Sequence, residues 1–176
     1  MANLTPTEIN NLIATLKKYP YLVTAVQGGT ISGAAVTGGT STALNPLASP
    51  PSADGDTETT DVTLYETEAE VQASYLTKNN LTLTITTRNV ANALSMASKI
   101  KKGDNVLDST KEYAVCLVPI TSATGEQNIL FPHAFLQPGP TVTPGENGEP
   151  MTVTLTFMCK PDTTSGVPFV YAAPAT

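Results

Sequence analysis

The chain has 176 residues, a length that suits one domain with a core of its own. Its net charge of −6 and pI near 4.6 exclude the basic surface that stable nucleic-acid binding requires. Only 14% of the residues are charged, against roughly 25% in an average soluble domain. So little charge is typical of a surface that partner proteins cover, although a secreted domain rich in Thr and Ser would look the same.

The start of the chain predicts a short amphipathic helix within residues 1–20. Thr5 and Glu8 have the spacing of a capping box, and Pro6 occupies the first helical position. The apolar side chains that follow recur at helical spacing, namely Ile9, Leu12, Ile13 and Leu16. Such a helix must dock on the domain or on a neighbouring subunit. No signal peptide and no membrane span are recognisable, so we expect no membrane partner.

Residues 27–60 are dominated by small and polar side chains and contain no aromatic residue. This composition predicts a long loop, and a loop of this length in a compact domain is rare unless it is functional. We therefore expect an ordered loop that bridges neighbouring subunits. Its candidate contact residues are Gly33, Gly38, Leu44, Pro46 and Leu47.

From Asp61 onward the pattern predicts strands. The expected strands cover residues 62–65, 71–76, 81–87, 113–118, 128–136, 151–157 and 168–172, after a possible first strand at 21–26. A helix is expected from Arg88 or Asn89 to about Lys102, with Gly103 as its stop. Pro132 predicts an edge or a bulge in its strand. Residues 21–176 are thus expected to form a single mainly β domain, a β-sandwich or partly closed barrel with one packed side helix.

Two predicted strands have an uncharged face made of threonines. Apolar residues alternate with Thr in both runs, and the threonines are Thr82, Thr84, Thr86, Thr152, Thr154 and Thr156. Natural sheets commonly protect exposed edges with charge, which these runs lack. The pattern favours pairing with a neighbour's strand, a protein contact, or the wall of a wet channel.

The acidic residues gather in one part of the chain. They are Asp54, Asp56, Glu58, Asp61, Glu66, Glu68 and Glu70, and the basic residues follow from Lys78. An acidic half beside a basic half suits head-to-tail contacts between identical subunits, and it fits an ordinary dipolar surface equally well.

The residue types needed for catalysis or metal binding are not grouped in the sequence. His133 has no acid or nucleophile close to it in sequence, so a packed structural histidine is expected. Cys116 and Cys159 lie in apolar runs and are expected to be buried thiols in a reducing compartment. We therefore expect a protein that is not an enzyme, with no catalytic, cofactor-binding or metal-binding residues.

The region from Asp61 to Tyr171 resembles the tail tube proteins of tailed bacteriophages, whose fold recurs in the inner tubes of contractile injection systems. The resemblance rests on the order of elements, on the strand-into-helix run at 81–100, and on Leu155-Thr156-Phe157 leading through Lys160-Pro161-Asp162 to Pro168-Phe169-Val170-Tyr171. It implies a homo-oligomer of hexameric rings, stacked into a hollow tube. Other tail proteins would be partners, and DNA would pass through without specific binding.

The resemblance also implies an acidic lumen and an inter-subunit loop, roles that suit the acidic cluster and residues 27–60. We therefore expect a structural tail tube subunit of the virion, assembled in the host cytoplasm, with the threonines at the lumen or at a subunit contact. The N-terminal helix departs from the simplest family members. Two alternatives stay open: a capsid decoration or head–tail connector protein, and a cell-surface adhesion or ligand-binding module.

Overall fold

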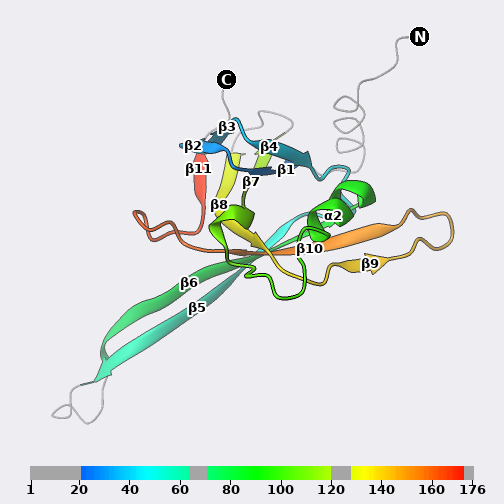
Figure 1. The fold of residues 1–176 in the computed structure, drawn as a ribbon. Helices are drawn as coiled ribbons and strands as arrows, with labels where there is room; N and C mark the ends of the chain where they lie inside the picture. The colour runs from blue at the N-terminus through cyan, green and yellow to red at the C-terminus, as the bar shows by residue number, and fades with distance from the viewer. Residues whose placement is uncertain (1–20, 64–70, 120–127, 173–176) are drawn as a thin grey trace.

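The computed structural model describes residues 21–63, 71–119 and 128–172 (Figure 1). In this part of the chain it has eleven strands and one α-helix. The strands are β1 (Tyr21–Gln27), β2 (Thr30–Ser32), β3 (Ala35–Thr37), β4 (Thr40–Ala43), β5 (Ser52–Thr63), β6 (Val71–Thr87), β7 (Glu112–Pro119), β8 (Asn128–Leu136), β9 (Thr141–Thr143), β10 (Thr152–Cys159) and β11 (Val170–Ala172). The helix is α2 (Val90–Ala97), and a 3-10 turn, η2 (Ser109–Lys111), precedes β7. The expected N-terminal helix lies outside the described residues.

Nine strands form one antiparallel sheet. Its order is β4-β1-β7-β8-β10-β6-β5, with β11 beside one part of β8 and β9 beside one part of β10. β2 and β3 pair only with each other, as a small hairpin. The expected mainly β class with one side helix is confirmed, and among the described residues the sheet is open, without closure into a barrel.

One hydrophobic core receives side chains from both ends of the sheet. Val23 of β1 and Val115 of β7 belong to the same buried cluster as Leu83 of β6 and Leu155 of β10, and all four are fully buried. Burial of each such side chain contributes about 1.5–3 kcal/mol. The alternation expected in residues 81–87 and 151–157 is confirmed, except that Met151 precedes β10 and is exposed.

Residues 44–51, here called the connector, join β4 to β5 and hold the two ends of the sheet together. The buried amide of Asn45 accepts a hydrogen bond from the Val23 N–H at 2.6 Å and donates to the Tyr21 carbonyl at 3.2 Å. The hydroxyl of Thr87, at the end of β6, donates to the Leu44 carbonyl. A buried polar group costs free energy unless it is hydrogen-bonded, so these bonds fix the connector in place.

The expected long loop at residues 27–60 is therefore wrong. The segment contains β2, β3, β4 and most of β5, and Leu44 and Leu47 are buried in the subunit's own core. Gly33 lies in the turn between β2 and β3, and Gly38 in the turn between β3 and β4. Small polar residues suit these strands because their outward positions face solvent.

Two glycines explain part of that composition. Gly29 and Gly39 follow β1 and precede β4, and their backbones pass so close that a Cβ on Gly39 would lie 2.6 Å from the Gly29 nitrogen and 2.7 Å from the Gln27 oxygen. Gly39 also has φ +73, a left-handed conformation that only glycine adopts without strain. The glycines serve a close backbone crossing at this end of the sheet.

Other expected elements differ in detail. α2 ends at Ala97, and the N–H groups of Lys99 and Ile100 then bond to carbonyls three residues back, which tightens the chain into a turn. α2 buries Ala93 and Met96, whereas Leu94 is 39% exposed. Pro132 lies at a bulge inside the sheet and not at its edge, since the register between β7 and β8 shifts there.

Leu155→Asp tests the direction of the core. It buries an unpaired charge among fully buried side chains, and we expect a loss of several kcal/mol, enough to unfold a domain of about 5–15 kcal/mol. Thr156→Asp, one position along and on the opposite face, should cost about 1 kcal/mol or less. Urea denaturation of both variants checks this, and a folded Leu155→Asp protein would show that the core lies elsewhere.

Gly39→Ala tests the backbone crossing. Gly38→Ala is its matched control, because Gly38 also has a positive φ but faces open space. Both changes carry the left-handed penalty of about 1–2 kcal/mol, and Gly39→Ala adds a clash with backbone atoms that cannot move aside. We expect Gly39→Ala to lower the free energy of unfolding by at least about 1 kcal/mol more than Gly38→Ala. Equal losses would contradict the crossing.

Candidate functional site

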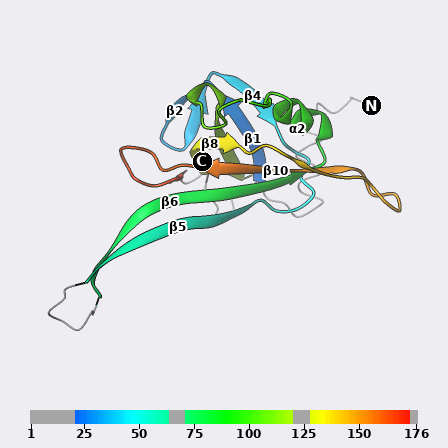
Figure 2. The same cartoon turned by 60° about the horizontal axis from the view of Figure 1, so that its bottom comes forward.

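The most prominent feature of the surface is a long arm formed by β5 and β6. From Asn80 back to Val71, β6 pairs only with β5. Figures 1 and 2 show this two-stranded ribbon extending away from the body of the molecule. Thr77 is an extra residue on β6, where the register shifts between Glu58 and Thr59 of β5. Such a bulge bends and twists a ribbon locally.

Two large apolar residues on the arm are exposed. Tyr75 is 62% exposed and Leu76 is 55% exposed. They are neighbours in β6, opposite Thr60 and Thr59 of β5, so they lie on opposite faces of the ribbon. An isolated two-stranded hairpin is at best marginally stable in water, and exposed apolar side chains do not strengthen it. The arm has the features of a surface that another protein covers.

The predicted threonine positions share one face of the sheet. Thr86 pairs with Thr154, where the two hydroxyls lie 3.0 Å apart, and Thr84 pairs with Thr156. The row continues with Thr82 on one side and with Thr152, opposite Thr143 of β9, on the other. All six expected threonines are half-buried, and the opposite face of their strands is the core. We call this surface the threonine face.

Three of the expected acidic residues continue the threonine face onto the arm. Asp54 lies opposite Thr82, Asp56 opposite Asn80, and Glu58 opposite Lys78. Lys78 forms ion pairs with Asp56 at 3.0 Å and with Glu58 at 3.2 Å. The hydrogen bond to Asp56 is the largest cause that raises the pKa of the Lys78 amine, and the hydrogen bond to Glu58 is the next.

The other expected acidic residues do not extend the threonine face within the described part of the chain. The alternation along β5 places Asp61 on the face opposite Asp54, and its carboxylate accepts a 2.6 Å hydrogen bond from the Ser74 hydroxyl. Glu66, Glu68 and Glu70 lie outside the described residues. The structure thus joins the threonines and three acids, which the sequence treats as two separate sets, into one polar face.

The threonine strands are not available as sheet edges. β6 is paired by β10 and β5, and β10 by β6, β8 and β9, so the expectation that these strands pair with a neighbour's edge is wrong. In the described part of the sheet the main strand order ends in β4 and β5, and the short strands β9 and β11 each pair with one strand only. β5 is long and acidic, and charge on an edge discourages unwanted pairing. At β4, the amides of Asn89 and Asn92 both donate to the Ala43 carbonyl.

His133 forms a second polar cluster, which the sequence did not reveal. Its Nδ1 lies 2.8 Å from a Glu112 oxygen, and its Nε2 lies 3.3 Å from an Asp162 oxygen. Asp162 also accepts hydrogen bonds from the Thr164 and Ser165 N–H groups, and these, followed by the bond with His133, lower the pKa of its carboxyl. Both acids are distant in sequence, so no local motif could have shown them. The histidine ties the loop after β10 to β7 and β8.

Two opposing effects act on the pKa of His133. Burial of the ring lowers the pKa, but the hydrogen bonds with Glu112 and then Asp162 outweigh burial, so the pKa is raised above its ordinary value of 6.5. The two cysteines are free, buried thiols as expected, and burial raises the pKa of Cys159 to about 12. Neither thiol therefore has the features of a reactive nucleophile.

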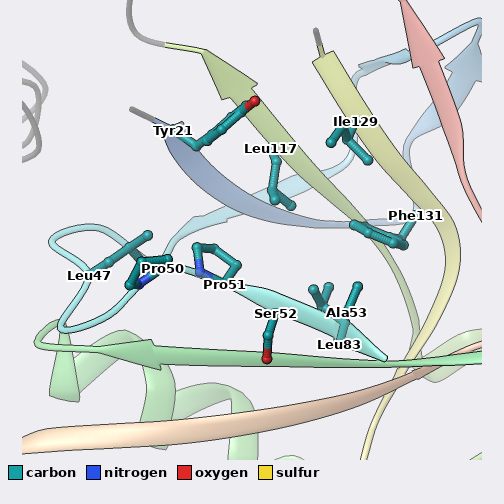
Figure 3. A pocket seen from close by; sticks show the side chains of 10 residues that line it. All are labelled: Tyr21, Leu47, Pro50, Pro51, Ser52, Ala53, Leu83, Leu117, Ile129 and Phe131. Atoms are coloured by element: carbon teal, nitrogen blue, oxygen red, sulfur yellow. The ribbon is translucent and has the colours of Figure 1, made fainter. Parts of the chain in front are cut away.

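An apolar pocket of about 310 Å³ lies at one end of the core. Figure 3 shows Leu117, Ile129 and Phe131 of the sheet on one side of it and Leu47, Pro50 and Pro51 of the connector on the other. Tyr21, the first described residue, also lines it. The lining is almost entirely apolar and lacks the convergent polar groups that orient a small ligand.

Within the described ranges, the chain has neither a group of side chains arranged for a metal ion nor a helix suited to a membrane. There, no group of three or more His, Cys, Asp or Glu side chains is arranged to hold a metal ion. No helix in residues 21–63, 71–119 and 128–172 is long and apolar enough to cross a membrane.

Comparisons with known proteins show a likeness to solved structures. No family model matches the sequence, and no curated protein matches it significantly. Among solved structures, the anti-feeding prophage cap, described as a tube-terminating cap, has a similar fold. The likeness covers 98% of this chain and 93% of that chain, with a TM-score of 0.50 and 11% sequence identity. At this identity the likeness concerns the fold alone.

His133→Gln tests the polar cluster. A group whose pKa is raised on folding stabilises the protein fully below its unfolded pKa of 6.5, and that contribution disappears as the pH rises through the higher folded pKa. We expect the variant to be less stable than the parent by about 1 kcal/mol or less near pH 5.5, and the difference to shrink near pH 8. Lys160→Gln, which removes a neighbouring cation, is the control. A pH-independent difference for His133→Gln would contradict the assignment.

Proposed function

We propose that this protein is a structural, non-enzymatic subunit of a phage-type tail tube, which assembles with copies of itself into rings that stack around a central channel. The observation that carries the proposal is the β5/β6 arm, with Tyr75 and Leu76 exposed on its two faces. A ring would cover the arm with a neighbouring subunit. In the free subunit the arm has little to stabilise it besides its own ladder.

The distribution of charge favours a head-to-tail arrangement over a two-fold dimer. Pairing two β5 edges about a two-fold axis would place acidic residues of one copy near those of the other, which is repulsive. Lys99, Lys101 and Lys102 are exposed after α2, and the Lys99 amine lies 3.5 Å from the side-chain oxygen of Gln27 at the β1–β4 end of the sheet. An acidic end that meets the basic end of the next copy gives a ring once the rotation closes.

The threonine face is suited to line the channel. Its hydroxyls carry no charge, and the row ends in Asp54, Asp56 and Glu58. The one cation on that stretch, Lys78, is already paired with two carboxylates. A surface of this kind repels phosphate weakly and offers no cationic binding site, so DNA would slide past it without specific binding. The protein would reside in the tail of the virion, in contact with other tail proteins.

The fold likeness favours a second candidate, a ring that ends a tube. The anti-feeding prophage cap terminates its tube, and its fold covers nearly the whole of this chain. A terminating subunit would use the same arm to close a ring but would not stack on further copies. The two candidates predict different assemblies of the pure protein.

The first experiment is negative-stain microscopy of the purified protein over a concentration series, with sedimentation velocity beside it. Tubes with a central channel support the tube subunit, and discrete rings that do not stack support the terminating ring. A monomer or a two-fold dimer at all concentrations would refute both.

Replacing Tyr75 and Leu76 with Ser tests the role of the arm. These side chains pack on little within the subunit, so the double variant should keep the parent's unfolding midpoint to within a few degrees while its assembly is lost. Leu107→Ser is the matched control, since Leu107 is also exposed but lies outside the arm. Normal assembly of the double variant would rule out the arm as the principal contact.

A further inference from the structure

We propose that residues 1–20 dock, through their apolar side chains, into the pocket at the end of this same subunit's core. The inference concerns the isolated subunit and does not depend on the proposed function. It assigns a position to the segment in which the sequence predicts an amphipathic helix.

The pocket is an opening of the core. Leu83 and Phe131, which line it, belong to the main buried cluster, and Leu117 lies beside them. A volume of about 310 Å³ corresponds to roughly ten water molecules at a liquid share of about 30 Å³ each. Water in such a place finds few hydrogen-bonding partners, so an apolar occupant gains free energy by displacing it.

The position of the pocket identifies the occupant. Tyr21 lines it, and residues 1–20 are joined directly to Tyr21. The other segments outside the described structure fit less well. Residues 64–70 connect β5 to β6 after the Thr63–Val71 pair of the arm, residues 120–127 contain one large apolar side chain, and residues 173–176 contain none.

The apolar residues of the segment have the spacing that such a groove requires. Ile9, Leu12, Ile13 and Leu16 recur at three- and four-residue intervals, which places them on one side of a helix. Pro20 interrupts a helix before β1, so the segment can turn back over the end of the core.

The connection is short enough for docking within one chain. Leu16 is five residues before Tyr21, and an extended chain of that length spans about 17 Å at most. A tether of a few residues gives an effective concentration in the millimolar range, which favours the segment's own subunit over a neighbour's at ordinary protein concentrations.

Limited trypsin digestion of the full-length protein tests the proposal, because Lys17 and Lys18 lie within the segment. Docking slows cleavage there, since the protease needs the segment released. Leu12→Asp places a charge among the docking residues and should speed cleavage at Lys17 and Lys18 at least about tenfold. Asn11→Asp, which puts the same charge on the opposite side of the expected helix, should leave the rate unchanged.

A second variant acts from the pocket side. Ala53 lines the pocket but is exposed, so Ala53→Leu fills part of the pocket without disturbing the core and should also speed cleavage. Equal rates for the parent, Leu12→Asp and Ala53→Leu would overturn the proposal. Protection that disappears on dilution to the monomer would also overturn it, because the occupant would then come from a neighbouring copy.

Discussion

The pairing of β6 with β10 is the constraint on which the rest of the structure depends. Where the two strands pair, fully buried apolar residues alternate with threonines, from Leu83 to Ile85 in β6 and from Val153 to Phe157 in β10. Because side chains alternate across a strand, this ladder fixes the core on one side and the threonine face on the other. β5 pairs with the other side of β6, so the same register places Asp54, Asp56 and Glu58 in line with the threonines. The core, the polar face and the direction of the arm are thus set by one register.

The sequence predicted those features that arise from periodicity over several residues. The alternating strands, β7, β8 and a helix capped by Asn89 follow from patterns that the chain shows locally. It failed for residues 27–60, where three strands of three or four residues are too short for any period, and where glycine marks a backbone crossing and not a loop. It also failed to show the arm, because β5 is polar on both faces and the composition of such a strand is that of a loop.

The candidate site could be predicted only in part, because local patterns show the residue types but not how separate strands align them. The threonines and the acids were both visible, but their alignment requires the β5–β6 register, which no single-strand pattern contains. The cluster of His133, Glu112 and Asp162 joins three elements distant in sequence. Leu44 and Leu47 were expected at a subunit contact because the small and polar composition of residues 27–60 predicted a loop that bridges subunits. The connector that buries them depends on Asn45 and Thr87.

The two asparagines that bond to the Ala43 carbonyl bear on how the sheet avoids pairing with strands of other copies. An open β-sheet can add strands of other copies at its two end strands, which is how fibrils grow. Here one end strand, β4, has only four residues and part of its outward backbone is already bonded to side chains, and the other, β5, is lined with carboxylates. Strand addition is therefore discouraged at both ends by different means. The assembly that we propose would then depend on side-chain recognition, which can wait for a correctly folded partner.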